Sequence, residues 1–555
     1  MGGPCHAYHR RRMVLVWSLL FAVSLQAADW EPLGPDGGSV HLLAIDRAHP
    51  ATLLAGTRSG LLFRTVNAAA QWNPLPLPRF PNTTLHSLAI DPENPQRFFA
   101  GLSDPTGKHS ALWLSEDTGE HWQRVEDLAG RAILSLAIRD TEPRLFAAGT
   151  DRGVYLSEDQ GRHWHLISPA GHPEMNGIVS LALDPRQPGT VYAGTTHLPW
   201  KTDDGGATWT SIHDGMIDDS DVFSILVDST RPGRVYSSAC SGIYASKNDG
   251  SLWAKAQGIP ADNRRTHVIA QDREYPNLLY AGTTAGLWKS ADSGATWKKL
   301  HGASVNSLTV DPRDGRVMYL ATDGGGVLKT MDAGRSWLGR NRGLVNRRVT
   351  SLASSGGSLY ATTIYEGDYG GIFVSKSGGR TWTLLADQRR LHGQNILRLR
   401  VRGAELIANT FNGRLVSQDA GKTWVFKPIK ATEPTGKVRG QVAFDVARSA
   451  LSPGVRLAAT MNGLERSTDN GKSWSRVTKG LPTGFVRAVA FHPKNPGECF
   501  VIQYARLYRS LDGGQSWEFL PGGDTPMLFV SLFVQGQLIY ALSEDRGIYR
   551  RQTMP

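Results

Sequence analysis

Residues 115–122 read Ser-Glu-Asp-Thr-Gly-Glu-His-Trp, and residues 157–164 read Ser-Glu-Asp-Gln-Gly-Arg-His-Trp. The same phrase, Ser-x-Asp-x-Gly-x-x-Trp in its cleanest form, recurs in eleven copies that each end on a tryptophan. The eleven are Trp72, Trp122, Trp164, Trp209, Trp253, Trp297, Trp337, Trp382, Trp424, Trp474 and Trp517. Repetition at intervals of roughly 40 to 50 residues is typical of a β-propeller, in which each repeat forms one blade.

We name this phrase the box turn. Asp and Ser side chains in a tight turn accept hydrogen bonds from nearby backbone N–H groups, and the glycine supplies a positive φ. The tryptophan then packs its ring against the sheet. We therefore predict a structural role, without catalysis or metal binding, for the box aspartates Asp117, Asp159, Asp204, Asp292, Asp332, Asp419, Asp469 and Asp512. Three copies have Asn67, Asn248 or Ser377 instead, and such losses are easier to tolerate in a turn than in a catalytic site.

The box turn resembles the Asp-box, or BNR repeat, of sialidases, sortilin-type receptors, xyloglucan-cleaving glycoside hydrolases and photosystem II assembly factors. The resemblance covers nearly the whole chain after its first residues. It implies an all-β propeller of four-stranded blades, with the box turn between the third and fourth strands of each blade. It does not by itself imply one function, because a single fold can carry many.

Two further apolar runs lie ahead of each box turn, so each repeat contains four short strands. In the first repeat these are residues 41–46, 52–57, 60–65 and the strand that follows Trp72. The innermost strands give twelve repeats, because residues 529–550 form a last repeat with no box turn and no fourth strand. The opening segment, residues 30–33, lacks preceding strands. We therefore predict that it completes the last blade, which removes an exposed edge.

Twelve blades exceed the roughly four to eight of a usual propeller. We therefore expect two propellers, and place the boundary between residues 298 and 345, because the Pro-bearing turns between first and second strands fade after about residue 340. The expected division is a signal peptide at 1–27, a first propeller at 28–340 and a second at 341–555.

The first residues have the pattern of a signal peptide. A basic cluster at residues 9–12 precedes an apolar run at 13–25 and then Gln26-Ala27-Ala28. The run is shorter than the roughly 20 residues that span a bilayer as a helix, and no other stretch is uniformly apolar. We expect a secreted or periplasmic protein without a membrane span after the signal is removed.

Composition excludes several classes of function. A formal net charge of +11 over 555 residues is only mildly basic, so we expect a solvated surface and no nucleic-acid partner. The histidines and cysteines show no metal-ligand spacing, and no phosphate-binding glycine loop occurs, so we expect no metal and no cofactor. Spacing leaves open a disulfide between Cys240 and Cys499. We expect a monomer.

The resemblance implies that ligand sites lie on the face opposite the box turns. We name it the hairpin face, because it is built from the hairpins that join second to third strands and from the connections between blades. Acids in its loops are candidate catalytic groups for a glycosidase, which needs two carboxylates: Asp218, Asp219, Asp221, Glu366 and Asp368. Aromatic and basic residues there are candidates for sugar stacking or anion binding: Tyr365, Tyr369, Trp200, Phe411, Arg264, Arg265, Arg347 and Arg348.

The sequence favours a binding scaffold for a protein or polysaccharide ligand, with secreted glycoside hydrolysis as the alternative. Regular box turns are similar to those of sortilin-like proteins, which implies binding. Two box-turn propellers and the glycines at 34–38 are similar to xyloglucan-cleaving enzymes, which implies catalysis. The chain departs from those enzymes at residues 64–69, where an Arg-Thr-Asp-x-Gly-Gly stretch is expected and Arg-Thr-Val-Asn-Ala-Ala stands. A groove between the rings with two carboxylates within about 10 Å would favour the enzyme, and a basic face would favour binding.

Overall fold

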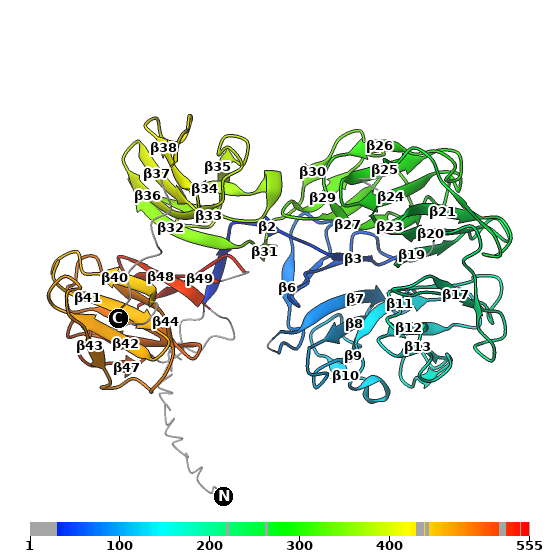
Figure 1. Ribbon diagram of the computed structural model, residues 1–555, viewed down its shortest axis with the longest axis horizontal. Coiled ribbons are helices and arrows are strands. Elements are labelled where there is room, and N and C mark those ends of the chain that lie inside the picture. The colour runs from blue at the N-terminus through cyan, green and yellow to red at the C-terminus, as the bar shows by residue number, and fades with distance from the viewer. Residues whose placement is uncertain are drawn as a thin grey trace, which may run out of the picture.

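The computed structural model describes residues 30–80, 82–217, 221–260, 265–428, 438, 443–520, 529–543 and 546–553. These residues form twelve four-stranded sheets and one two-stranded parallel sheet, arranged as two rings that lie side by side (Figure 1). The predicted all-β fold of two propellers with four-stranded blades is confirmed. The predicted signal peptide lies outside the described residues. No helix in the described part of the chain is both long and apolar enough to cross a membrane.

The first ring has seven blades, and each blade uses its strands in chain order. Its strands are β3 (Leu42–Ile45), β4 (Leu53–Gly56), β5 (Leu62–Thr65), β6 (Asn73–Leu75); β7 (Thr84–Ile90), β8 (Phe98–Ser103), β9 (Ala111–Ser115), β10 (Gln123–Arg124); β11 (Ile133–Ile138), β12 (Phe146–Thr150), β13 (Gly153–Ser157), β14 (His165–Leu166); β15 (Ser180–Leu183), β16 (Val191–Gly194), β17 (Pro199–Thr202), β18 (Thr210–Ser211); β19 (Val222–Val227), β20 (Val235–Ala239), β21 (Gly242–Ser246), β22 (Trp253–Lys255); β23 (Thr266–Gln271), β24 (Leu279–Thr283), β25 (Gly286–Ser290), β26 (Lys298–His301); and β27 (Val305–Val310), β28 (Met318–Thr322), β29 (Gly326–Thr330), β30 (Leu338–Gly339). The 3-10 helix η1 (Glu126–Leu128) follows β10.

The second ring has five blades, of which the last takes its outer strand from the start of the chain. Its strands are β32 (Val349–Ser355), β33 (Ser358–Thr363), β34 (Gly371–Ser375), β35 (Thr383–Asp387); β36 (Ile396–Arg402), β37 (Glu405–Thr410), β38 (Gly413–Ser417), β39 (Val425–Pro428); β40 (Ala443–Arg448), β41 (Arg456–Thr460), β42 (Gly463–Ser467), β43 (Ser475–Val477); β44 (Val486–Phe491), β45 (Cys499–Gln503), β46 (Arg506–Ser510), β47 (Glu518–Phe519); and β48 (Phe529–Gln535), β49 (Leu538–Ser543), β50 (Ile548–Gln552), β1 (Glu31–Gly34). The 3-10 helix η3 (Gly367–Tyr369) lies between β33 and β34.

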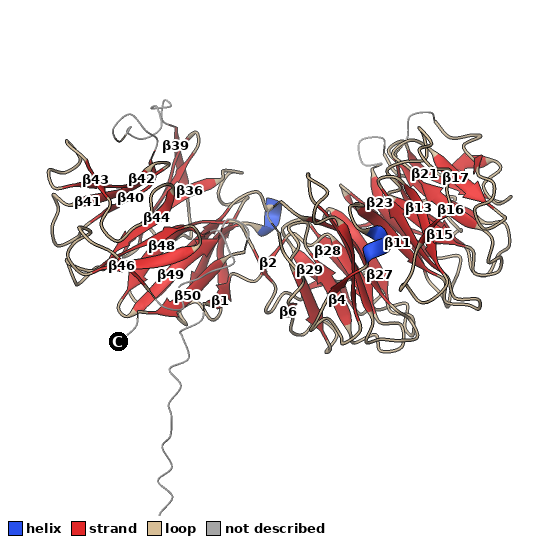
Figure 2. Cartoon of the chain, turned by 90° about the horizontal axis from the view of Figure 1, so that it is seen from below, coloured by secondary structure: helices blue, strands red, loops and turns tan. Residues whose placement is uncertain are grey.

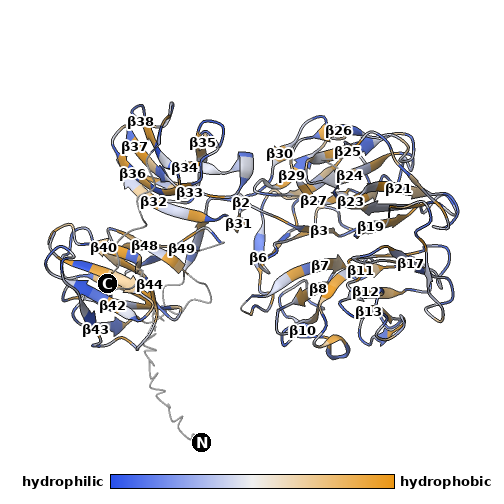
Figure 3. Cartoon of the chain, viewed as in Figure 1, coloured by the Kyte–Doolittle hydropathy of each residue, from blue (hydrophilic) through white to orange (hydrophobic). Residues whose placement is uncertain are grey.

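Neighbouring blades pack closely because their second strands are apolar and small. Figure 3 shows apolar residues concentrated on the strands and polar residues on the loops. In β12 every residue is buried, and a Cβ added at Gly149 would lie 2.6 Å from the carbonyl oxygen of Ile178, which enters the next blade. Ser135 donates a hydrogen bond to that same carbonyl at 2.8 Å. Ser180 bonds Val222 O at 2.8 Å in the following blade, so a polar bond recurs between adjacent blades.

The box turns lie between third and fourth strands, as predicted. Ser115 Oγ accepts the Gly119 N–H at 2.9 Å and donates to Asp117 Oδ1 at 2.8 Å, while that same Oδ1 accepts the His121 N–H at 2.9 Å. Hydrogen bonds from His121 lower the pKa of Asp117 to about 2, so the carboxylate stays ionised. The structural role of the eight aspartates stays a prediction, which these bonds support.

Copies without the aspartate keep the same bond with another acceptor. Asn67 Oδ1 accepts the Gln71 N–H at 3.0 Å, and Asn248 Oδ1 accepts the Leu252 N–H at 3.0 Å. Ser377 Oγ accepts the Thr381 N–H at 2.8 Å. The turn therefore needs an oxygen acceptor at this position but not a charge.

Both rings are closed by contacts between distant parts of the chain. In the first ring β3 lies beside β27, and Leu43 N–H donates to Ser307 Oγ at 3.3 Å. In the second ring β1 pairs antiparallel with β50, with Glu31 opposite Arg550. Trp382 Nε1 donates to Leu33 O at 2.8 Å. The predicted closure of the last blade by the N-terminal strand is confirmed. Cys240 and Cys499 are both free thiols.

We predict that Leu33→Ala lowers the free energy of unfolding by about 2–4 kcal/mol, because it leaves a cavity in a packed core. Leu33 is 6% exposed and packs against the first and last blades of the second ring. Urea denaturation followed by tryptophan fluorescence measures the change. Leu384→Ala is the matched control, because Leu384 is 44% exposed. Equal losses in the two variants would show that β1 does not close the ring.

Candidate functional site

The two rings meet at a short parallel sheet. β2 (Gly37–Gly38) pairs with β31 (Val345–Asn346), and Figure 2 shows β2 between the rings. Gly37 and Gly38 have φ values of +103° and +106°. A Cβ at Gly38 would lie 2.0 Å from the carbonyl oxygen of Asn346. Only glycine therefore allows the N-terminal segment to cross so close to the linker between the rings.

Arg347 holds this junction together. Its side chain is 6% exposed, and its guanidinium lies 4.7 Å from the centre of the Phe373 ring. Nε donates to Asp36 O at 2.7 Å, and Nη1 donates to Gly324 O at 3.3 Å and to Tyr369 O at 3.1 Å. One side chain thus binds the N-terminal segment, the last blade of the first ring and the first blade of the second ring.

Glu366 is the ionic partner of Arg347. Its side chain is 3% exposed, and Oε2 accepts a hydrogen bond from Arg347 Nη1. Oε1 accepts the Arg348 N–H at 3.2 Å. Burial raises the pKa of Glu366, and the Arg347 guanidinium opposes that rise. Both carboxylate oxygens are occupied, so the residue is committed to the junction.

A cleft of about 410 Å³ opens beside this ion pair on the hairpin face. Its walls come from the β4–β5 hairpin, the β31–β32 linker and the β33–β34 loop, so both rings contribute. The lining residues are Ser39, His41, Thr57, Arg58, Ser59, Asn82, Thr83, Thr84, Asn346, Arg348, Tyr365 and Glu366. We name it the junction cleft.

Positive charge dominates the junction cleft. Arg58 and Arg348 are exposed, and no ion pair of either guanidinium occurs within the part of the chain that the structure describes. Arg348 lies 5.9 Å from the centre of the Tyr365 ring. Tyr365 is 60% exposed and has a φ of +58°, an uncommon value for a residue with a side chain. The cleft thus offers two guanidinium groups and an accessible aromatic ring.

His41 forms the floor of the junction cleft as a neutral ring. Burial, followed by the charge of Arg58, lowers the pKa of His41 to about 4. Its Nε2 lies 4.0 Å from Asp323, which partly opposes that shift. Its Nδ1 is buried without a hydrogen-bond partner among the described residues. At neutral pH the ring therefore adds no charge to the cleft.

The junction cleft contains some of the predicted site residues but not all. Glu366, Tyr365 and Arg348 line it, and Arg347 lies directly behind. Asp218, Asp219 and Arg264 lie outside the described residues. Sequence reasoning missed Arg58 and His41. Arg58 lies in the turn Thr57-Arg58-Ser59-Gly60, which joins the second and third strands of its blade. Such turns were expected on the ligand face, and this position was the only feature of the sequence that could have indicated Arg58.

The remaining acids do not share this cleft. Asp221 is absent from its lining, and its Oδ2 accepts a hydrogen bond from Cys240 Sγ at 3.4 Å. Asp368 in η3 is exposed and forms a loose ion pair with Arg389 at 3.4 Å. Of the predicted acids that the structure describes, only Glu366 lines the junction cleft, and the catalytic assignments stay predictions.

The remaining aromatic and basic candidates are dispersed. Tyr369 packs against Gly325 at the junction. Trp200 meets His172 edge-on, with ring centres 5.0 Å apart. Arg265 lies 5.1 Å from the centre of the Phe223 ring, and Phe411 is 60% exposed on the second ring. Their binding roles stay predictions.

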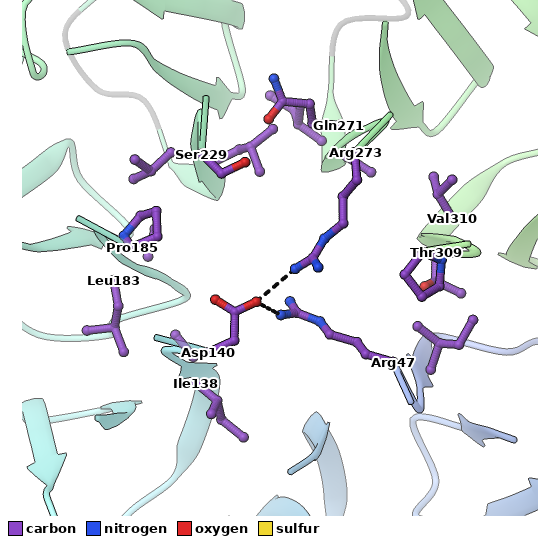
Figure 4. A pocket seen from close by; sticks show the side chains of 18 of the residues that line it. Arg47, Ile138, Asp140, Leu183, Pro185, Ser229, Gln271, Arg273, Thr309 and Val310 are labelled. Carbon is purple, nitrogen blue, oxygen red and sulfur yellow. Dashed lines mark hydrogen bonds and ion pairs between the residues drawn. The ribbon is translucent and has the colours of Figure 1, made fainter. Parts of the chain in front are cut away.

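The central channel of the first ring holds a second cavity, of about 460 Å³. Figure 4 shows Arg47 and Arg273 pointing toward Asp140 from different blades. Asp140 Oδ2 accepts hydrogen bonds from Arg273 at 2.8 Å and from Arg47. All three residues follow innermost strands, so they lie on the same face as the box turns. Side chains from three blades thus cross the channel at that face.

Comparisons with known proteins agree with this architecture. The family model described as "Sortilin, neurotensin receptor 3" (Sortilin-Vps10) matches residues 110–218. No curated protein matches the chain. The predicted resemblance to sortilin-like and xyloglucanase-like propellers is confirmed as a likeness of fold.

Three solved structures show the likeness over most of the chain. A GH74 xyloglucanase from Xanthomonas campestris has a TM-score of 0.61 and 19% identity, over 95% of this chain and 87% of that chain. A GH74 enzyme from Niastella koreensis has a TM-score of 0.60 and 17% identity, over 95% and 99% of the chains. An ancestral GH74 enzyme has a TM-score of 0.67 and 15% identity, over 95% and 99%. At these identities the likeness establishes the fold alone.

We predict that Asp140→Asn lowers the free energy of unfolding by about 0.5–1 kcal/mol, because two guanidinium groups then face each other without a carboxylate. The three side chains are between 32% and 55% exposed, so solvent screens them. Thermal unfolding at low salt measures the loss. In 1 M NaCl the difference from the parent chain should shrink, since salt screens the Arg–Arg repulsion. A loss that persists at high salt would contradict this electrostatic account.

We predict that the ring of His41 stays neutral until the pH falls to about 4. In the unfolded chain the same ring takes up a proton near pH 6.5. Protonation therefore favours the unfolded chain, so the contribution of neutral His41 to stability is complete above pH 6.5 and is lost as the pH falls toward 4. NMR of ¹³C-histidine-labelled protein, with His41→Asn to assign the signal, measures the pKa.

Arg58→Gln should raise the pKa of His41, because it removes the nearby positive charge. Arg335→Gln is the control, since Arg335 lies in a box turn on the opposite face. A His41 titration at about 6.5 in the parent chain would overturn the assignment.

Proposed function

We propose that this chain is an exported propeller protein that binds a protein or polysaccharide ligand across its hairpin face. The observation that carries the proposal is the junction cleft. Arg58 and Arg348 reach it from different rings, while its lining carboxylate, Glu366, is already paired with Arg347. This arrangement suits the binding of an anionic group.

The chemistry of the cleft selects carboxylates or similar anions. Guanidinium groups bind such groups through paired hydrogen bonds. The exposed ring of Tyr365 adds a surface for stacking. A chain that carries regularly spaced carboxylates, such as an acidic polysaccharide or an acidic protein segment, matches these groups.

Glycoside hydrolysis is the second candidate, because GH74 enzymes share the fold over 95% of this chain. A glycosidase needs two carboxylates about 5–10 Å apart, one to donate a proton and one to attack or activate water. Among the described residues that line the junction cleft, Glu366 supplies one carboxylate. Its ion pair with Arg347 opposes its use as a proton donor or as a nucleophile. Binding without hydrolysis is therefore the favoured function.

We also propose that the rings are separate domains, at 28–340 and 341–555, with β1 belonging to the second. Support comes from the closure of each ring by its own strands, β3 beside β27 and β1 beside β50. The linker around β31 then joins them.

We predict that the double variant Arg58→Ala/Arg348→Ala weakens binding of polygalacturonate at least tenfold, because both exposed guanidinium groups of the cleft are lost. Affinity electrophoresis with polygalacturonate in the gel measures the change, and rising salt should weaken the parent chain toward the variant. The matched control is Arg335→Ala/Arg380→Ala, which removes two exposed arginines from box turns on the opposite face.

A reducing-sugar assay on polygalacturonate and on neutral xyloglucan separates binding from hydrolysis. No released sugar is the expected result. Sugar release that disappears in Asp221→Asn would replace the proposal with a hydrolase. Glu366→Gln is a poor probe, because it leaves Arg347 buried without its partner. Equal polygalacturonate binding by the parent chain and the cleft variant would exclude the junction cleft as the binding site.

A further inference from the structure

The tips of the second-to-third hairpins differ between the two rings. Three hairpins of each ring have two-residue tips between paired strand ends, so their first tip residues occupy the same structural position. In the first ring these residues are Asp151, Cys240 and Thr284, and in the second ring they are Phe411, Met461 and Tyr504. At this position the side chains are therefore small or polar in the first ring and large and apolar in the second.

The apolar tips stand out in solvent. Phe411 is 60% exposed, Met461 61% and Tyr504 58%. Tyr365, in the longer hairpin of the first blade of this ring, is 60% exposed. Large apolar side chains at the tips of four consecutive blades are unlike the isolated ones found on most soluble surfaces.

Further apolar side chains continue this surface toward the ring axis. Ala443 pairs with Thr460 across the sheet. Their neighbours in sequence, Phe444 and Met461, therefore lie at the same level of the ring. Phe485 precedes Val486, which pairs with Gln503 beside Tyr504. The rings of Phe444 and Phe485 meet edge-on, with centres 5.0 Å apart, and Phe444 is 44% exposed.

The hairpin at Tyr504 is built at a conformational cost. Tyr504 and Ala505 have φ values of +49° and +59°. Two-residue hairpins with positive φ at both positions usually carry Asn and Gly, which adopt that conformation more readily. The Tyr504 hydroxyl donates a hydrogen bond to Thr483 O at 3.0 Å, which holds the side chain in this turn while most of its surface stays exposed.

Among the described residues near the apolar tips, the exposed charges are mainly positive. On the hairpin face of this ring, Arg389, Arg390, Lys479 and Arg506 are exposed. Two described carboxylates near them are engaged: Asp368 pairs with Arg389, and Asp387 Oδ1 accepts the Arg390 N–H at 3.0 Å. An acidic partner is therefore complementary in charge, whereas a second copy of this chain would bring like charges together.

We propose that the hairpin face of the second ring docks a protein segment that combines apolar and acidic side chains. The residues that contact it are Phe411, Met461, Tyr504 and Tyr365, with Phe444 toward the axis. Met461 decides between protein and polysaccharide, because a thioether offers no flat ring for sugar stacking but is favoured where protein surfaces adapt to one another. This inference rests on the proposed function and deepens it, because it adds a second contact surface on the same hairpin face and names a protein segment as the ligand there.

A random 12-residue peptide display library, selected on the immobilised protein, tests the proposal. The selection is run in parallel on the triple variant Phe411→Ser/Met461→Ser/Tyr504→Ser. Enriched peptides should combine aromatic or aliphatic residues with Asp or Glu. Fluorescence anisotropy of one labelled peptide should show binding at least tenfold weaker to the triple variant, because exposed aromatic anchors carry much of the affinity of an interface.

The matched control is Asp151→Ser/Cys240→Ser/Thr284→Ser, which changes the same hairpin position in the first ring and should leave peptide binding unchanged. Thermal unfolding should be similar for the parent chain and the triple variant, since the second-ring tips are about 60% exposed. The single cleft variant Arg58→Ala, which leaves the contact between Arg348 and Tyr365 in place, should also bind the peptide normally, so failure of the cleft proposal and failure of this one are distinguishable.

Four outcomes would overturn the proposal. The first is a selection on the parent chain that enriches no peptides beyond those enriched on the triple variant. The second is equal binding of the enriched peptides to the parent chain and to the triple variant. Retention of xyloglucan or polygalacturonate that is lost in the triple variant would identify a polysaccharide surface instead. Light scattering that shows a dimer of the parent chain, absent in the triple variant, would identify a second copy of this chain as the occupant.

Discussion

The buried ion pair between Arg347 and Glu366 is the interaction on which the two-ring arrangement depends. Both side chains are almost fully buried, so removing either charge would leave the other without its partner in a poorly solvated position. Arg347 also bonds carbonyl oxygens of Asp36, Gly324 and Tyr369. The pair therefore fixes how the N-terminal segment, the first ring and the second ring meet, and it sets one wall of the junction cleft.

The two faces of the molecule have different tasks. On one face the box turns bind their own backbone, and the Arg47–Asp140–Arg273 cluster crosses the first channel. On the other face, arginines at the junction and apolar tips on the second ring remain exposed. Side chains already satisfied by local hydrogen bonds have little left to offer a ligand, which is why both proposals fall on the hairpin face.

The repeated phrase was enough to predict the blades, their four strands and the position of the box turns, because these depend on local turn chemistry and on short-range periodicity. The closing strand was also predictable, since residues 30–33 lacked partners. The partner of Glu366 was not, because both Arg347 and Arg348 stood as ligand candidates and no pattern marks which one turns inward. Arg58 and Arg348 lie far apart in sequence, and only the meeting of the two rings brings them to one cleft.

The pairing of β1 with β50 has a topological consequence. Glu31 and Arg550 are 519 positions apart. Along the chain, β1 of the five-bladed ring comes first, the entire seven-bladed ring follows, and the other nineteen strands of the five-bladed ring come last. The larger ring is in this sense an insertion within the smaller one. The smaller ring cannot complete its circle until the last strand has been synthesised, whereas the larger ring is assembled from one continuous stretch.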